Sequence, residues 1–559
     1  MKKFYGVMNA LCSILLISQA SMAHNPVISQ KYTADPNAIV YNDRVYVYCS
    51  HDDNNRDNGF NIFDYTLVSS DDMVNWTDHG EVFVVPRDAK WASQAYAPGA
   101  AVKGDKVYLY IPDGGSKIGV AVADRPEGPF TDPINKALIT KSMPNCNVEW
   151  LFDPACFVDD DGQAYLYFGG GQNTPGDNLR VIKLNEDMIS VDGTAKTILA
   201  PRSFEAAFMH KYNELYFFSY SNDFAQSPQA QIAYMTGSSP MGPFDHKGSV
   251  LDNPAIDGQN INKGNNNHAS IVEYKDKWYI FYHDRRLSDQ TYKRSVSVDL
   301  VTYNDDGTLM NKTECTTDGP PQIKNFNPYD TVQAETIYKQ SGIKTDICNE
   351  GGIMVTKISA DDFISLKGVD FSTGADKFEV RAASASSGGS IELHRGSKTG
   401  TLVGTCEITG TGGWNSWQTF SCDVENCSGV DDLYLVFKGS DEPFRLNWYM
   451  FFGSTGTTGT TGTTGSPFSV KTTESGIVSQ TINGVILEFD TDGPLFSETV
   501  KKRTVVKLFN LKGEIVKSSI PNGSNSLKMD LSDEENGFYI IKVVSGGRIV
   551  HSSKMVITR

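Results

Sequence analysis

The chain has 559 residues, with 50 Lys and Arg against 67 Asp and Glu, so its formal net charge is −17 at pH 7. This balance argues against nucleic acid as a partner, because a basic surface is the usual footprint of such binding. Hydrophobic residues make up 39% of the chain, enough for packed cores, and the length predicts about three to five domains. The many Tyr and Phe residues favour an all-β fold.

Residues 1–23 have the pattern of a secretory signal peptide. Two lysines precede an apolar stretch over residues 10–17, and Ser21-Met22-Ala23 is a small-residue cleavage site, so the mature chain is expected to begin at His24. The apolar stretch is shorter than the ~20 residues of a membrane span, and none recurs later, so we expect no transmembrane segment.

Eight cysteines remain in the mature chain, in a compartment where disulfides can form. Cys406, Cys422 and Cys427 lie close together in the sequence, and one of them is a candidate to pair with Cys348. The spacings do not match a zinc site, and the disulfide connectivity cannot be read from them.

Residues 24–320 contain one aromatic strand five times, each time after a polar turn. The copies read DRVYVYCS, DKVYLYIP, GQAYLYFG, NELYFFSY and DKWYIFYH, and the tyrosines that they share are Tyr46, Tyr108, Tyr165, Tyr216 and Tyr279. Repeats of this length suit one propeller blade of four strands, so the pattern predicts a five-bladed β-propeller. The alternative is that Tyr-rich strands recur in any β protein.

A second repeated segment precedes each aromatic strand and is predicted to be the innermost strand of its blade. Its copies read ADPNAIV, YAPGAAV, FDPACFV, FEAAFMH and NHASIVE. Because the first strand of each blade lines the central channel, equivalent positions converge on one axis. Those positions hold Asp35, Ala97, Asp153, Glu205 and His268.

Three carboxylates are thereby expected in one cleft. Repulsion between them raises the pKa of at least one, and carboxyl groups with separated pKa values are what acid–base hydrolysis of a glycosidic bond requires. The alternative is that each Asp-Pro pair only starts a strand. A calcium cage is disfavoured, because Ala34, Phe152 and Phe204 precede the three acids where oxygen ligands would be needed.

Residues 26–315 resemble glycoside hydrolase family 43, a family of five-bladed propellers, through TADPNAIV, WLFDPACFVDDDG and RSFEAAFMH. The resemblance implies that Asp35 is the general base, Glu205 the general acid, and Asp153 the residue that orients the acid and tunes its pKa. It also implies inversion of the anomeric configuration, for which the carboxyl groups lie about 6.5–9.5 Å apart, and it implies no required cofactor.

His268 matches the axial histidine of that family and Arg294 a recurring arginine that reaches the substrate; a core histidine and a strand-edge salt bridge are the alternatives. Three segments resemble the arabinoxylan-acting members of that family: NPVISQKYTADPNAIV, SSDDMVNWTDHG and AYAPGA. That resemblance makes Tyr96 an aromatic wall of the sugar site, with core packing as the alternative.

The expected activity is removal of α-L-arabinofuranosyl groups from arabinoxylan, with plant cell-wall polysaccharide as the partner. A β-xylosidase or an endo-xylanase on the same scaffold, and a non-catalytic sugar-binding propeller, are the alternatives. The choice of sugar depends on rim loops, whose conformation the sequence does not reveal.

Residues 329–453 resemble a family 6 carbohydrate-binding module, a β-sandwich, through VQAETIY, TGGWNSWQTF, DDLYLVFKG and FRLNWYMF. The resemblance implies that Trp414 stacks on a sugar and that Glu335 is a ligand of a structural calcium ion. Three residues depart from the family pattern. Lys357 stands where a partner tyrosine is common, Arg445 where a ligand-binding asparagine is common, and Asn447 where an aspartate is common at the calcium site. We therefore expect weak or altered sugar binding, with a purely structural sandwich as the alternative.

Residues 454–465, STGTTGTTGTTG, are predicted to be a linker because they carry no apolar side chain that can pack. Residues 466–559 alternate short strands with turns and resemble the C-terminal sorting domain of the type IX secretion system. The resemblance implies the type IX secretion machinery as a partner and a bacterial protein that is secreted or attached to the cell surface. The alternative is a small sandwich appended for stability.

Overall fold

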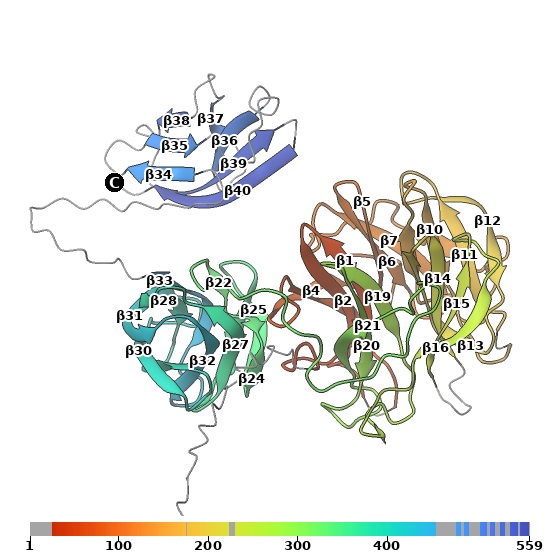
Figure 1. Ribbon diagram of the computed structural model, residues 1–559, viewed down its shortest axis with the longest axis horizontal. Coiled ribbons are helices and arrows are strands. Elements are labelled where there is room, and N and C mark those ends of the chain that lie inside the picture. The colour runs from red at the N-terminus through yellow and green to blue at the C-terminus, as the bar shows by residue number, and fades with distance from the viewer. Residues whose placement is uncertain are drawn as a thin grey trace, which may run out of the picture. The chain divides into compact units, whose positions relative to one another are not determined.

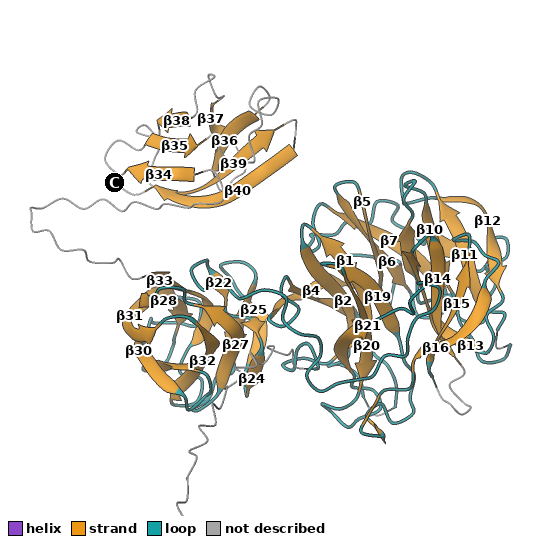
Figure 2. Cartoon of the chain, in the orientation of Figure 1, coloured by secondary structure: helices purple, strands orange, loops and turns teal. Residues whose placement is uncertain are grey.

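The structure, a computed structural model, describes residues 25–453 except residues 57, 175 and 223–229, together with the strands between residues 477 and 557. Every regular element in this part of the chain is a β-strand (Figure 2), which confirms the predicted all-β class. None of the described residues belongs to a helix long and apolar enough to cross a bilayer. The expected signal peptide and the Thr/Gly linker lie outside the described residues.

Five antiparallel sheets form the predicted propeller (Figure 1). The first sheet consists of β1 (Thr33–Tyr41), β2 (Arg44–His51), β3 (Asp64–Ser70) and β4 (Trp76–Val84). The second consists of β5 (Gly99–Lys103), β6 (Lys106–Pro112), β7 (Lys117–Ala123) and β8 (Ile139–Thr140). The third sheet consists of β9 (Ala155–Val158), β10 (Ala164–Phe168), β11 (Leu179–Leu184) and β12 (Val191–Ile198). The fourth consists of β13 (Ser203–Tyr212), β14 (Leu215–Asn222), β15 (Ile232–Gly237) and β16 (Asp245–Leu251). A hairpin of β17 (Ala255–Ile256) and β18 (Gln259–Asn260) precedes the fifth, made of β19 (Ala269–Tyr274), β20 (Lys277–Asp284) and β21 (Ser295–Val301).

The repeated aromatic strand is the second strand of each blade, and it joins one blade to the next. The hydroxyl of Tyr48 in β2 donates a hydrogen bond to the Pro126 carbonyl of the second blade, at 2.8 Å. Tyr167 in β10 donates in the same way to Pro240 of the fourth blade, at 2.6 Å. Because blades pack against neighbours on both faces, these strands are buried along nearly their whole length.

The inner strands β1, β5, β9, β13 and β19 contact one another in turn, and β19 contacts β1 again. The ring is closed by the residues that precede β1: the Val27 amide donates to Val296 O at 2.8 Å. The Asn25 side chain accepts from the Val298 amide at 2.9 Å. The fifth blade, which has three strands, is thereby edged by the start of the described chain.

Two further sheets form the predicted β-sandwich. One is ordered β25 (Lys344–Ile347), β26 (Ile353–Thr356), β33 (Arg445–Gly453), β28 (Ala375–Ala383) and β31 (Trp417–Cys427), with β22 (Val332–Gln333) also paired to β33. The other is ordered β24 (Lys339–Ser341), β27 (Phe363–Asp370), β32 (Val430–Gly439), β29 (Gly388–Arg395) and β30 (Thr401–Thr409). Their inner faces share one apolar core, which includes Phe378, Phe437 and Phe451.

The propeller and the sandwich are joined by a shared strand. Strand β23 (Thr336–Ile337) pairs with β4 and adds a fifth strand to the first blade, with Thr336 opposite Thr77. Beside it, the buried Asp78 accepts hydrogen bonds from Lys31 of the propeller at 3.2 Å and from Thr345 of the sandwich at 2.7 Å. The described chain from residue 25 to 453 is part of one compact unit.

A second compact unit comprises residues 456–559. Its described strands form two small antiparallel sheets, in agreement with the predicted C-terminal β domain. They are β34 (Ile477–Thr481), β35 (Ile486–Asp490) and β38 (Ser526–Asp530) in one sheet, and β37 (Ile515–Ser519), β36 (Thr504–Asn510), β39 (Gly537–Ser545) and β40 (Arg548–Ile557) in the other.

Candidate active site

The three predicted acids lie at the start of the inner strands of three blades. Asp35 lies in β1, Asp153 two residues before β9, and Glu205 in β13. Asp35 and Asp153 have left-handed backbones, with φ of 49° and 48°, and Ala206 beside Glu205 has φ of 61°. Such conformations cost about 1–3 kcal/mol each in residues other than glycine and gather at functional sites. The register irregularities of β1 and β13 at these points re-aim the side chains.

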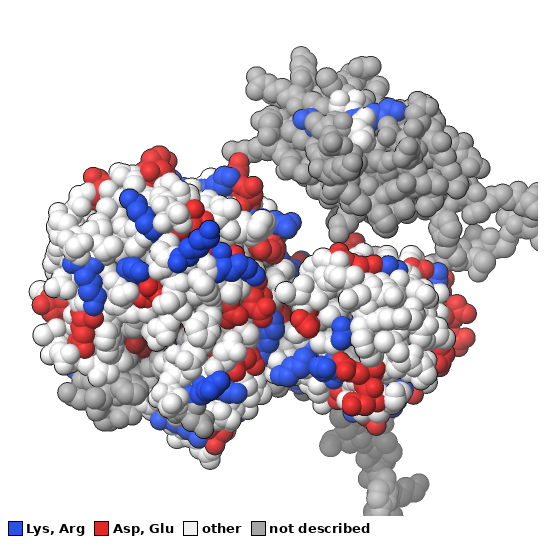
Figure 3. Space-filling model, turned by 180° about the vertical axis from the view of Figure 1, so that it is seen from behind, with Lys and Arg blue, Asp and Glu red and all other residues white. Residues whose placement is uncertain are grey.

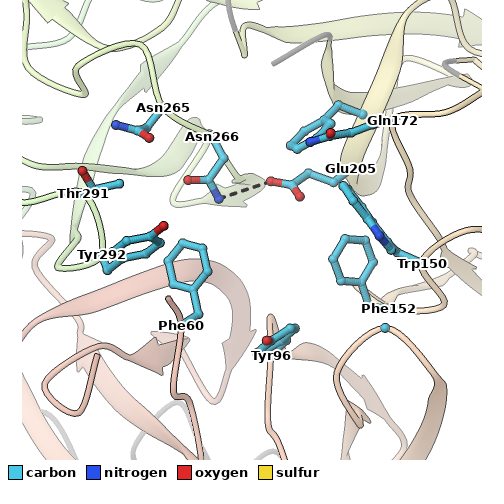
Figure 4. Close-up of a pocket in the computed structure, with 12 residues that line it drawn as sticks. Phe60, Tyr96, Trp150, Phe152, Gln172, Glu205, Asn265, Asn266, Thr291 and Tyr292 are labelled. Carbon is cyan, nitrogen blue, oxygen red and sulfur yellow. Dashed lines mark hydrogen bonds between the residues drawn. The ribbon is translucent and has the colours of Figure 1, made fainter. Parts of the chain in front are cut away.

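The three acids line an inner cavity, and Glu205 also lines an outer one. The outer cavity, of about 430 Å³, is shown in Figure 4 and is lined by Phe60, Tyr96, Gly115, Trp150, Phe152, Gln172, Phe204, Glu205, Asn265, Asn266, Thr291 and Tyr292. The inner cavity, of about 70 Å³, is lined by Asp35, Phe60, Ile62, Tyr96, Ala97, Phe152, Asp153, Glu205, Asn266, His268 and Arg294. Glu205 and Tyr96 border both, so the structure brings together every residue predicted for the propeller site.

Asp35 is held as a carboxylate by an arginine. Arg294 donates from Nη1 to Asp35 Oδ1 at 2.6 Å, and both side chains are buried. Burial alone would raise the pKa of the Asp35 carboxyl, but the charge of Arg294 holds that pKa well below its usual range. Asp35 is therefore ionised at neutral pH.

Arg294 is fixed in turn by Asp52, at the end of the second strand of the first blade. Its Nε donates to Asp52 Oδ2 at 2.7 Å and its Nη2 to Oδ1 at 2.9 Å, a bidentate pair. The guanidinium also lies over the Phe60 ring, 4.5 Å from the centroid. An arginine with all of these partners cannot move away from Asp35 without leaving a buried charge unpaired.

The surroundings of Glu205 shift its pKa in the opposite direction. Its side chain is 8% exposed, and its Oε1 accepts a hydrogen bond from Asn266 Nδ2 at 3.2 Å (Figure 4). Burial and then the negative charge of Asp35 raise the pKa of Glu205 from 4.5 to about 8, against the smaller lowering effect of Asn266. Glu205 therefore carries a proton at neutral pH, while Asp35 does not.

Asp153 and His268 line the same inner cavity as these two groups. Asp153 Oδ2 accepts from the Ala206 amide at 3.1 Å, which ties it to the residue after Glu205. Burial, followed by repulsion from Glu205 and Asp35, raises the pKa of Asp153 well above its usual value. His268 Nδ1 is 3.8 Å from an oxygen of Asp35 and 3.8 Å from an oxygen of Asp153. Burial lowers the pKa of His268 to about 4, so the imidazole is neutral.

Three further residues that the sequence did not single out support the site. His283 accepts at Nδ1 from the Asp35 amide, at 3.3 Å, and its Nε2 lies 2.9 Å from the Asn266 carbonyl oxygen. Arg285 donates from Nη2 to Asn266 Oδ1 at 2.8 Å. This chain of contacts orients the Asn266 amide so that its NH2 group faces Glu205. The available signal was a polar run, HDRR, at the end of the last aromatic strand.

The residues predicted for the sandwich lie apart from the propeller cavities. Trp414 is half-buried, and the Arg445 guanidinium covers its ring at 4.9 Å from the centroid. Lys357 pairs with Glu442 at 3.1 Å. Arg445 thus occupies a face of the tryptophan on which a sugar would stack.

Glu335 is buried at the junction with the propeller, and its Oε2 has no hydrogen-bond partner among the residues that the structure describes. Burial raises the pKa of this carboxyl well above its usual value. Asn447 donates from Nδ2 to Glu350 at 2.9 Å, so its Oδ1 is the atom left to act as a ligand. Carboxylate and amide oxygens are ligands that suit a hard cation such as calcium.

Charged side chains of both signs are interspersed on the face shown in Figure 3. This arrangement agrees with the acidic overall charge and offers no basic footprint there for a nucleic acid.

Comparison with known proteins identifies each segment. Residues 23–309 match the model of glycosyl hydrolases family 43, residues 333–452 match carbohydrate binding module (family 6), and residues 488–558 match the secretion system C-terminal sorting domain. The predicted families are thereby confirmed, and the sorting domain implies secretion or surface attachment.

Two curated relatives are arabinoxylan arabinofuranohydrolases. The one from Paenibacillus polymyxa is 38% identical over 521 residues, covering 85% of this chain and 81% of the relative. The one from Bacillus subtilis (strain 168) is 41% identical over 463 residues, covering 74% of this chain and 89% of the relative. A crystal structure of a glycoside hydrolase family 43 arabinoxylan arabinofuranohydrolase from Bacillus subtilis, in complex with cellotetraose, matches with a TM-score of 0.72 at 38% identity, covering 78% of this chain and 99% of that one. The chain therefore belongs to glycosyl hydrolases family 43 and is a glycosidase.

Proposed function

We propose that the propeller removes α-L-arabinofuranosyl groups from arabinoxylan by a single displacement at the anomeric carbon. The observation that carries this proposal is the opposite protonation of two carboxyl groups in one cavity, Asp35 ionised and Glu205 protonated. Hydrolysis of a glycosidic bond requires one base and one acid at the same time, which is what this pair supplies at neutral pH.

In the proposed reaction, Asp35 takes a proton from a water molecule while the water oxygen bonds to the anomeric carbon. The bond from that carbon to the leaving oxygen breaks, and Glu205 gives its proton to the leaving oxygen. Asp153 and Asn266 are positioning residues that hold Glu205 in place. Asp153 accepts a hydrogen bond from the Ala206 amide, and Asn266 donates one to Glu205 Oε1. A separation of about 6.5–9.5 Å between the Asp35 and Glu205 carboxyl groups stays a prediction of this mechanism.

The choice of arabinofuranosyl groups rests on two observations. The aromatic residues Phe60, Tyr96 and Phe152 border an inner cavity much smaller than the outer one, which suits a single terminal sugar better than an internal unit of a threaded xylan chain. Two relatives, which cover 85% and 74% of this chain, are also arabinoxylan arabinofuranohydrolases. Tyr96 would present an apolar ring face to the C–H groups of the sugar.

Product analysis tests this proposal. The purified chain, incubated with arabinoxylan, arabinan and xylo-oligosaccharides, should release arabinose from arabinoxylan, and chromatography should show no shortening of the xylan backbone. Release of xylose would instead support a β-xylosidase, and release of xylo-oligosaccharides an endo-xylanase. Tight binding of arabinoxylan without any product would support a sugar-binding propeller and contradict the catalytic roles.

The sandwich is proposed to hold a structural calcium ion at Glu335 and Asn447. Calcium binding would give the buried Glu335 carboxylate the partner that it lacks within the described chain. If this is correct, a calcium chelator should lower the unfolding temperature of the wild type but leave that of Glu335→Gln unchanged. An equal response of both proteins would show that Glu335 is not a ligand.

Export is proposed to begin with signal cleavage before His24 and to continue through the type IX secretion machinery. The C-terminal sorting domain supports this route. Mass spectrometry of the protein recovered outside the cell should give His24 as the first residue. An intact residue 1 on that protein would contradict the predicted cleavage.

A further inference from the structure

Two cysteines of the sandwich lie on strands that form the edges of its two sheets. Cys406 is in β30, the last strand of one sheet, and Cys422 is in β31, the last strand of the other. The strands touch here: a Cβ placed on Gly404 would lie 2.9 Å from the Asp423 carbonyl oxygen. The two strands follow one another in the chain, so residues 410–416 cross between the sheets at this edge.

The two side chains point into the same core. Cys406 is fully buried in the apolar cluster of the sandwich, and Cys422 is half-buried and packs against that cluster. Each thiol shifts the pKa of the other, raising that of Cys406 and lowering that of Cys422, so the two thiols are neighbours in this core. Two thiols that pack into one core from touching strands can be joined by a disulfide through a small side-chain movement.

We propose that Cys406 and Cys422 form a disulfide that links the two sheets of the sandwich in the exported protein. Disulfides persist outside the cytoplasm, and the sorting domain directs this chain there. Other thiols are bonded elsewhere: Cys49 donates to the Val47 carbonyl and Cys146 to the Pro144 carbonyl. The inference rests on export of the chain and is independent of the proposed hydrolysis.

The bond forms by thiol–disulfide exchange with an external disulfide, either of a cell-envelope thiol oxidase or of oxidised glutathione. The neighbouring Cys406 thiol lowers the pKa of Cys422, which is also the more accessible of the two, so Cys422 attacks first. Its sulfur bonds to one external sulfur, and the other leaves as a thiolate. Cys406 then loses its proton and attacks the Cys422 sulfur, and the second external thiolate leaves. Two cysteine thiols are oxidised to one disulfide, and the external disulfide is reduced to two thiols, which take up the two protons.

The disulfide would close the base of the segment that carries Trp414. Residues 407–421 lie between the two cysteines and include the turn that presents this tryptophan. Closing a loop of this length restricts the unfolded chain and holds the two strand edges together. The disulfide therefore stabilises the sandwich and keeps the Trp414 segment in one conformation.

Peptide mapping tests the bond directly. Cleavage after glutamate yields residues 393–407, residues 408–425 and a third peptide that begins at residue 426, so Cys406, Cys422 and Cys427 are separated. Full-length protein recovered outside the cell, alkylated without reduction and digested, should give the first two peptides as one linked species, two hydrogen masses lighter than their sum. Recovery of both peptides with alkylated cysteines would overturn the proposal.

A second experiment uses purified reduced protein, so that its outcome does not depend on export or on hydrolysis. Oxidised glutathione should raise the unfolding temperature of the sandwich by several degrees in the wild type and in the control Cys427→Ser. It should leave Cys406→Ser and Cys422→Ser unchanged. The same rise in all four proteins, or no rise in any, would contradict the bond, while arabinose release should not respond to glutathione in any of them.

Discussion

Replacing Arg294 should shift the acidic limb of the pH–activity profile, because this arginine keeps Asp35 ionised. The guanidinium Nη1 lies 2.6 Å from Asp35 Oδ1, and no other cation is hydrogen-bonded to that carboxylate within the described residues. Simple removal would leave Asp52 buried and unpaired, so the variant is Arg294→Gln combined with Asp52→Asn. Asp52→Asn alone is the matched control, since Arg294 keeps its contact with Asp35 there.

The size of the shift follows from Coulomb's law. Opposite unit charges about 4 Å apart, in surroundings with an effective dielectric constant of about 20, attract by about 4 kcal/mol. One pKa unit corresponds to about 1.36 kcal/mol, so loss of this attraction should raise the pKa of Asp35 by about three units. Asp35 acts as a base only when ionised, so its folded pKa sets the pH below which activity is lost.

The assay is kcat/KM for arabinose release from arabinoxylan oligosaccharides as a function of pH. The wild type should stay active well into the acidic range, and the double variant should lose activity at a pH about three units higher. Asp52→Asn should keep most of the wild-type acidic range. An unchanged acidic limb in the double variant, with the fold intact by circular dichroism, would refute the assignment of Asp35 as the base held by Arg294.

Three further predictions concern the acid, its positioning and the fold. Glu205→Gln should lower kcat/KM on arabinoxylan by about 10²–10⁴-fold, but much less on an aryl arabinofuranoside whose leaving group needs no proton; equal losses on both would contradict the acid role. Asn266→Ala should move the basic limb to higher pH by about one unit, because Asn266 lowers the pKa of Glu205 through a hydrogen bond of about 1.5 kcal/mol or more. Asn265→Ala, which lines the same cavity, is the control and should leave that limb in place. Tyr167→Phe should lower the free energy of unfolding in urea by about 1–3 kcal/mol, because the buried Pro240 carbonyl loses its donor; no change in the urea midpoint would show that this blade contact is not stabilising.

The sequence was sufficient to predict the propeller because each blade repeats the same physical solution. Tyr48 of the first blade and Tyr167 of the third blade each donate a hydrogen bond to a carbonyl of the next blade. Because packing between blades requires similar aromatic residues in each copy, the repeat can be recognised in the sequence. The register of the inner strands follows from that repeat, which is why Asp35, Asp153 and Glu205 could be placed in one cleft.

The supporting residues could not be predicted because their contacts join distant parts of the chain without a repeated pattern. Asp52 and Arg294 are 242 positions apart, and Asn266 and Glu205 are 61 apart. The same limit applies to the sandwich: Arg445 was predicted only as a departure from the family pattern, and its position over the Trp414 ring depends on the turn that precedes β31.

The stereochemistry of the first product tests the central claim most directly. Proton NMR of an arabinoxylan digest, recorded within the first minutes before mutarotation, distinguishes the two anomers of the released arabinose. Single displacement, with Asp35 activating water opposite the leaving oxygen, predicts that the β anomer appears first from the α-linked substrate. Initial formation of the α anomer would show retention and would contradict the roles of Asp35 and Glu205.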